Sequence, residues 1–176
     1  RQMCIRDSVT VTNASVNALN AKAAVLKGNN TITLSGTTLE GKETADTIPY
    51  NIVLFSDEKD IGTMGTQHFD VRGGSLISHK GGMFYVTATH GKISLNGTAI
   101  TMDDPAANLI TVAGNDGANG WGTPGRNGGH VELVADNQVL TGNISVDSIS
   151  NINMTLNYYA HATSDSAMAE MERLIA

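Results

Sequence analysis

The most chemically suggestive segment of the chain is a glycine-rich stretch, residues 114–129, which contains its only tryptophan, Trp121. A flat aromatic ring on a loop can stack on a sugar ring, and amide or guanidinium groups beside it can hydrogen-bond to the sugar hydroxyls. The candidate ligand-binding residues in this stretch are Trp121, Asn119, Arg126 and Asn127. The alternative is that Trp121 folds back and anchors the loop against the protein.

Side chains with oxygen or imidazole groups are also candidate metal ligands. The alternative set of calcium ligands is Asn115, Asp116 and Asn119. Their spacing lacks the regular acidic pattern of a calcium loop and that of the calcium-binding nonapeptide repeat. A zinc site at one corner would use His68, His90 and His130, but no ligand motif supports it. We therefore expect no metal ion and no cofactor.

Two carboxylates make catalysis an alternative to ligand binding. Asp70 and Glu132 fall on expected outward strand positions two repeat units apart, a separation that approaches the window of an inverting glycosidase. Arg72 is the nearby candidate for a lyase base. Nucleophilic catalysis has no candidate, because no serine lies in a Gly-x-Ser-x-Gly motif and Cys4 lies in an irregular N-terminal segment.

An internal repeat provides the elements that would position these residues. Short segments recur with apolar residues at their first and third positions, which is the period of a strand. They begin at Val9, Ile32, Phe69, Ile93, Val131 and Ile152. Their fifth positions, where we expect a corner with left-handed backbone, are Asn13, Gly36, Gly73, Gly97 and Ala135. Five residues after the second apolar position comes another apolar residue, although Leu133 leads to Val139 with a step of six.

A third apolar strand completes each unit, at residues 23–26, 52–55, 83–86, 109–112 and 144–146. This repeated order of three strands joined by corners predicts an all-β, three-sided parallel β-helix over residues 9–157, with about five turns. Equivalent inward residues should form ladders between turns about 4.8 Å apart. One expected ladder is Val11, Leu34, Val71, Leu95, Leu133 and Met154, and another is Val9, Ile32, Phe69, Ile93, Val131 and Ile152. An antiparallel sandwich also has short strands and glycine-rich turns, but it does not explain the fixed step.

Two of the units are lengthened by insertions, residues 56–68 and 114–129. Both follow the third strand of their unit, so they should emerge from the same corner. The short corner between them carries His90, which joins the candidate ligand-binding residues. Insertions on one face of a repeat protein often mark its binding face. The alternative is that these loops only shield the corner.

Composition excludes several classes of function. The chain has 11 basic and 17 acidic residues, a net charge of −6, and no basic cluster, which argues against nucleic acid as a partner. No segment reaches the roughly 18–20 apolar residues that cross a bilayer, so we expect no membrane insertion of this chain.

A resemblance to a known family follows from three stretches of sequence. Residues 81–87 (GGMFYVT), 93–97 (ISLNG) and 114–129 (GNDGANGWGTPGRNGG) resemble bacterial β-helix repeat proteins of the pectin-lyase-like fold, which are similar to surface adhesins and autotransporter passenger regions. The resemblance covers residues 28–156 and implies a right-handed helix and a surface location. It brings no catalytic motif.

Both ends of the chain depart from the repeat. Residues 1–8 have no strand or helix period, and we interpret them as a non-native leader. Residues 158–176 form a tail in which Ser164 or Asp165 could cap a helix. Such a helix could cover the end of the solenoid, or the tail could be truncated or foreign sequence.

These observations favour a non-catalytic, extracellular or cell-surface protein that is adhesin-like or binds glycans. Its expected partner is a glycan or another cell-surface ligand, and the chain is expected to be part of a larger parent. The alternatives are a polysaccharide-degrading hydrolase or lyase, and a purely structural stalk.

Overall fold

The computed structural model describes residues 8–18, 23–26, 28–42, 51–56, 66–114, 128–147 and 150–157. Within these residues all regular structure is β-strand, and every pair of neighbouring strands is parallel. The prediction of an all-β, parallel architecture is therefore confirmed. The expected helix in the C-terminal tail and nearly all of the N-terminal leader lie outside the described residues. The described part of the chain contains no helix of the length and apolarity that crossing a membrane requires.

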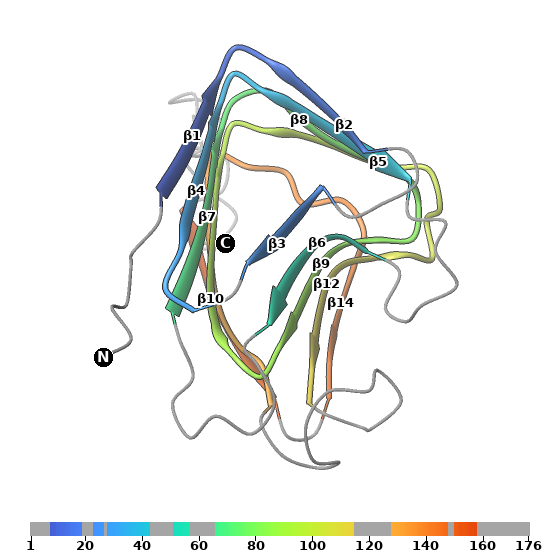
Figure 1. Cartoon of the computed structure of the whole chain (residues 1–176). Helices are drawn as coiled ribbons and strands as arrows, with labels where there is room; N and C mark the ends of the chain where they lie inside the picture. The colour runs from blue at the N-terminus through green and yellow to red at the C-terminus, as the bar shows by residue number, and fades with distance from the viewer. Residues whose placement is uncertain are drawn as a thin grey trace, which may run out of the picture.

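The strands form three parallel sheets, each of which takes one strand from successive repeat units. Sheet A contains β1 (Ser8–Thr12), β4 (Thr31–Ser35), β7 (Thr66–Arg72), β10 (His90–Asn96), β13 (His130–Asp136) and β15 (Asn151–Asn157). Sheet B contains β2 (Ser15–Ala18), β5 (Thr38–Lys42), β8 (Ser75–Lys80) and β11 (Ala99–Met102). Sheet C contains β3 (Ala24–Leu26), β6 (Asn51–Ser56), β9 (Gly82–Thr87), β12 (Asn108–Ala113) and β14 (Asn143–Val146). Figure 1 shows the sheets as three sides around one interior, an arrangement compatible with a parallel β-helix.

Aliphatic side chains and a small aromatic cluster fill this interior. Along β7, buried and more exposed residues alternate, as expected for a strand with one face on the core. Phe55, Phe69 and Phe84 come from sheets C, A and C, and their ring centroids lie 5.4–6.3 Å apart with tilted or edge-to-face geometry. All three phenylalanines of the chain are buried, and together they fill one section of the core.

Corners with left-handed backbone follow the strands of sheet A. Gly74 has a positive φ within its corner, and so does the first residue of each corner: Asn13, Gly36, Gly73, Gly97 and Asn137. Four of the five were predicted, but the choice of Ala135 was wrong because β13 pairs two residues further along than the apolar pattern indicated. In the structure Leu95 pairs with Ala135, and Ile93 pairs with Leu133. A period of two residues cannot distinguish these two registers, since both place apolar side chains inward.

The same correction removes the irregular step after β13. Counted from Ala135, the next apolar residue five positions on is Leu140, which packs against the core. Val139, the predicted inward residue, is instead 68% exposed. The five-residue step therefore holds in every unit that the structure describes. The corrected ladder is Val11, Leu34, Val71, Leu95, Ala135 and Leu156.

Candidate functional site on the outer face of sheet A

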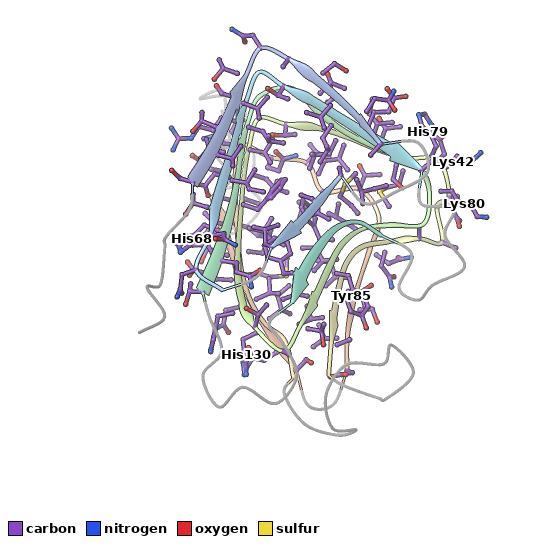
Figure 2. The ribbon with its side chains drawn as sticks, in the orientation of Figure 1. Lys42, His68, His79, Lys80, Tyr85 and His130 are labelled. Carbon is purple, nitrogen blue, oxygen red and sulfur yellow. The ribbon has the colours of Figure 1, made fainter. Side chains whose placement is uncertain are left out.

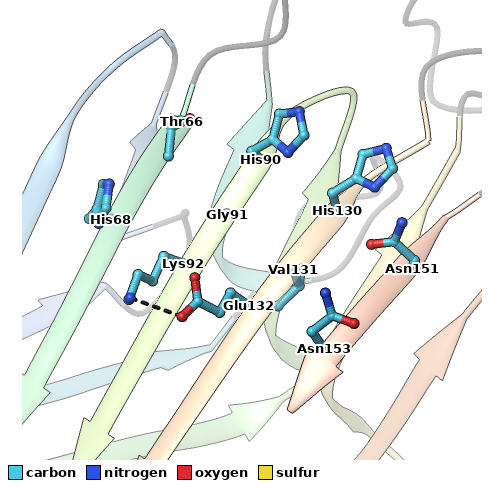
Figure 3. A pocket seen from close by; sticks show the side chains of 10 residues that line it. All are labelled: Thr66, His68, His90, Gly91, Lys92, His130, Val131, Glu132, Asn151 and Asn153. Atoms are coloured by element: carbon cyan, nitrogen blue, oxygen red, sulfur yellow. Dashed lines mark hydrogen bonds and ion pairs between the residues drawn. The ribbon is translucent and has the colours of Figure 1, made fainter. Parts of the chain in front are cut away.

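The outward side chains of sheet A form rows that run across the strands. The row at the end of the sheet where the long insertions leave is Thr66, His90, His130 and Asn151, which we call the loop-side row. The next row is Thr31, His68, Lys92, Glu132 and Asn153. All of these residues except Thr31 line a hollow of about 470 Å³, whose residues are drawn in Figure 3. A second hollow of about 300 Å³ adjoins it at Thr66 and His68 and reaches Asn29.

Two histidines form the centre of the loop-side row. His90 and His130 are register partners on β10 and β13, and their rings stack with centroids 4.9 Å apart and planes inclined by 17°. Figure 3 shows both rings on the same side of the sheet. Imidazole rings offer polar nitrogens as well as flat faces, so this pair can both hydrogen-bond and stack.

An ion pair lies in the row next to the two histidines. Lys92 Nζ lies 2.9 Å from Glu132 Oε1, across the same two strands. Both side chains are partly exposed, so the pair contributes only about 0–1 kcal/mol to stability. The pair places a hydrogen-bond donor and an acceptor side by side in the lining of the hollow.

Buried contacts set the position of the loop-side row. Beneath it, Gln67 Nε2 donates a hydrogen bond of 3.0 Å to Thr89 Oγ1, which joins the start of β7 to the corner before His90. At the base of the second insertion, the Gly129 amide donates to the Ala113 carbonyl at 3.1 Å. The amide of Gly114 donates to the Asp147 carboxylate, which fixes the other side of this base. The described ends of the insertion therefore lie next to His130.

The predicted corner is thus formed, although only part of the predicted ligand set can be placed. His90 is one of the residues that line the hollow. The loop residues Trp121, Asn119, Arg126 and Asn127 lie outside the described residues, as do the calcium candidates Asn115 and Asp116. The stacking of His90 on His130 was missed, because the sequence register paired His130 with His68. Aligning Asn137 with Gly97 as corner residues would have revealed it.

The two candidate catalytic carboxylates do not share a row. Glu132 aligns with Lys92 and His68, whereas Asp70 aligns with Ser94 and Val134. Two strand spacings across the sheet and two residues along it put their Cα atoms about 12 Å apart. The two carboxylates are therefore separated along the strands as well as by two repeat units, because of the same two-residue shift in the register of β13. Arg72 lies one row further on, beside Asn96.

Among the described residues, no group of three or more histidine, cysteine, aspartate or glutamate side chains could hold a metal ion. In particular His68 lies in a different row from His90 and His130. The described part of the chain therefore gives no support to the zinc alternative.

Comparisons with known proteins assign no family to the chain. No family model and no solved structure matches it. A stretch of 25 residues is 84% identical to the transposases of transposon Tn916 from Enterococcus faecalis and transposon Tn1545 from Streptococcus pneumoniae and Streptococcus agalactiae. The stretch is 14% of this chain, and it spans only 6% of the length of those transposases. This likeness is too short to describe the protein as a whole.

Proposed function

We propose that the chain is a section of a right-handed, pectin-lyase-like β-helix of about five turns, from an adhesin-like protein at the cell surface or outside the cell. In this proposal the outer face of sheet A binds a glycan without cleaving it. The resemblance of residues 81–87, 93–97 and 114–129 to bacterial β-helix repeat proteins supports the fold. The parallel pairing of equivalent strands from successive units is what such a fold requires.

One observation carries the binding proposal: the hollow at the loop-side row is lined by imidazole, amide, ammonium and carboxylate groups. Such a mixture of donors and acceptors suits the many hydroxyl groups of a sugar. The hollow runs across several strands, so an extended chain of sugars could contact more than one row. A polar, half-open surface of this kind suits recognition of a flexible polymer.

The insertion that leaves the sheet beside His130 extends the proposed surface. Its Trp121 is proposed to stack on a sugar ring, and Asn119, Arg126 and Asn127 to hydrogen-bond to hydroxyls. The ends of the insertion, at Gly114 and Gly129, are held by the hydrogen bonds of Asp147 and Ala113. These bonds place the two described ends of the insertion at the same end of sheet A as the stacked histidines.

A glycan array tests the proposal. The unmodified chain is expected to bind at least one class of glycan, and the double variant His90→Ala/His130→Ala to lose about tenfold or more in affinity, which corresponds to about 1.4 kcal/mol. Both histidines are at the surface, so the variant should fold. The matched control is Thr101→Ala, an exposed change on sheet B that should leave binding unchanged.

A second variant, Trp121→Ala, separates the contribution of the insertion from that of the strands. Loss of binding in both variants supports a surface that includes the insertion. Absence of binding by the folded, unmodified chain would contradict the proposal and favour the structural stalk.

The enzyme alternative predicts that the protein shortens the bound glycan, whereas the binding proposal predicts no cleavage. We therefore expect the chain length of the glycan to stay unchanged after prolonged incubation with the protein, as measured by size-exclusion chromatography and by new reducing ends. Shortened products that disappear with Asp70→Asn or Glu132→Gln would instead establish catalysis by these carboxylates. An unchanged product pattern in those variants would point to a contaminant.

A further inference from the structure

Sheet B contains a histidine that the glycan site does not use. Gly41 pairs with Ser78, but the next residue of β5, Lys42, pairs with Lys80. His79 is therefore the extra residue of a β-bulge in β8. Bulges change the direction of a side chain and are common where a strand has a particular role. Figure 2 shows His79 at the outer corner of the molecule, near Lys42 and Lys80.

The ring of His79 lies between two carboxylates from neighbouring strands. Its Nε2 is 2.6 Å from Glu40 Oε1, and its Nδ1 is 2.7 Å from Asp103 Oδ2. Glu40 belongs to β5, and Asp103 directly follows β11. The Asn17 side chain on β2 donates a further bond of 3.4 Å to Glu40 Oε2. This line of side chains thus links β2, β5 and β8 with the residue that follows β11.

The two short contacts require a particular protonation state. An ionised carboxylate only accepts hydrogen bonds, and a neutral imidazole has a single N–H to donate. Both contacts can be hydrogen bonds only when both ring nitrogens carry a proton. The hydrogen bond with Glu40, followed by that with Asp103, raises the pKa of His79 above its ordinary value. Burial acts in the opposite direction but is outweighed.

We propose that Glu40, His79 and Asp103 form a proton-dependent clasp that joins three successive repeat units across sheet B. With His79 protonated, both carboxylates are held. With His79 neutral, one carboxylate faces a ring nitrogen without a proton, and that contact opens. The other charged side chains near this line are Lys42 on β5, Lys80 on β8 and Asp104, which follows Asp103.

The direction of the pH effect follows from the raised pKa in the folded state. The stabilisation that protonated His79 contributes is fully present below the ordinary histidine pKa of about 6.5. It is lost as the pH rises through the higher pKa that His79 has in the folded state. The clasp therefore holds at low pH and opens as the pH rises above the pKa of His79 in the folded state. Backbone pairing near Asp103, whose amide donates to the Ser78 carbonyl, should loosen with it.

The test combines an NMR titration of the histidine rings with thermal unfolding at several pH values. In the unmodified chain we expect His79 to titrate above the ordinary value, and the melting temperature to fall as the pH is raised through that titration. In Asp103→Asn the titration should move to lower pH, because an amide can donate to a neutral ring. In His79→Gln the fall in melting temperature over this range should be lost.

The matched control is Lys92→Met, which removes an ion pair between two neighbouring strands of sheet A and leaves His79 and its two carboxylate partners in place. It should keep the pH dependence of the unmodified chain. A His79 ring that titrates at or below its ordinary value would overturn the proposal, and so would full pH dependence in His79→Gln. The ring titration is made on the unmodified chain, so it decides the question even where a variant folds poorly.

Discussion

Replacing Phe84 with alanine is expected to lower the free energy of unfolding by about 3–5 kcal/mol. Phe84 is fully buried, and its ring contacts Phe69 with centroids 5.4 Å apart and Phe55 with centroids 6.3 Å apart. The substitution removes both contacts and leaves a cavity between sheets A and C. The parallel backbone pairing on both sides of β9 resists collapse of this space, so the cost should lie high in the usual range.

Chemical denaturation followed by circular dichroism measures this effect. Phe84→Leu is the graded control, because it keeps most of the apolar volume and should cost less than the alanine variant. Val139→Ala is the surface control, since Val139 is 68% exposed and its truncation should change stability by less than about 0.5 kcal/mol. Equal losses in Phe84→Ala and Val139→Ala would contradict the placement of the aromatic cluster in the core.

Replacing Gly74 with alanine is the second change with a large expected effect. Gly74 has a φ of +67°, and a Cβ atom there would lie 2.2 Å from the Thr37 carbonyl oxygen and 2.6 Å from its amide nitrogen. These atoms belong to the backbone of the preceding repeat unit and cannot move aside as a side chain would. Left-handed strain of about 1–2 kcal/mol adds to overpacking of about 1–3 kcal/mol. We expect a total loss of about 2–5 kcal/mol.

The neighbouring residue provides a matched control for this prediction. Gly73 also has a positive φ, +61°, but a Cβ atom there meets no other atom within 4 Å. Gly73→Ala should therefore show only the strain of the left-handed backbone, about 1–2 kcal/mol. The difference between the two melting curves isolates the contact with Thr37. If both variants lose the same stability, the close approach of these two corners is wrong.

The strands and their grouping could be predicted from the sequence because each unit repeats the same local signals. Alternating apolar residues, a corner residue that tolerates positive φ, and a fixed step to the next strand all agree in the units that contain Gly36, Gly73 and Gly97. Agreement between independent local signals is what makes a segment predictable. Parallel pairing then follows, because equivalent strands of successive units run in the same direction.

The register of β13 could not be obtained from alternation alone. Val131, Leu133 and Ala135 are all buried, so a shift by two residues leaves the apolar pattern intact. Asn137 was the better indicator, because its corner can be aligned with Gly97 independently of the strand. Gln138 adds to this alignment, since its side chain exchanges two hydrogen bonds with the backbone of Thr98, at 2.9 and 2.7 Å.

The candidate site was harder to predict than the fold because its side chains come together only through the register. The corner from which the insertions leave could be found from their position in the repeat. The stack of His90 on His130 and the pairing of Lys92 with Glu132 depend on matching residues 40 positions apart in sequence. An error of two residues replaced these contacts with the incorrect pairs of His130 with His68 and of Asp70 with Glu132.

The most direct test of the central proposal is an NMR titration of the histidine rings with a mixture of neutral and acidic hexasaccharides. The chain has five histidines, so each ring can be assigned by single substitution. A glycan-binding surface at the loop-side row predicts that the resonances of His90 and His130 shift together as sugar is added, while that of His79 on sheet B stays in place. Shifts confined to His79, or no shift in any ring at saturating sugar, would contradict the account.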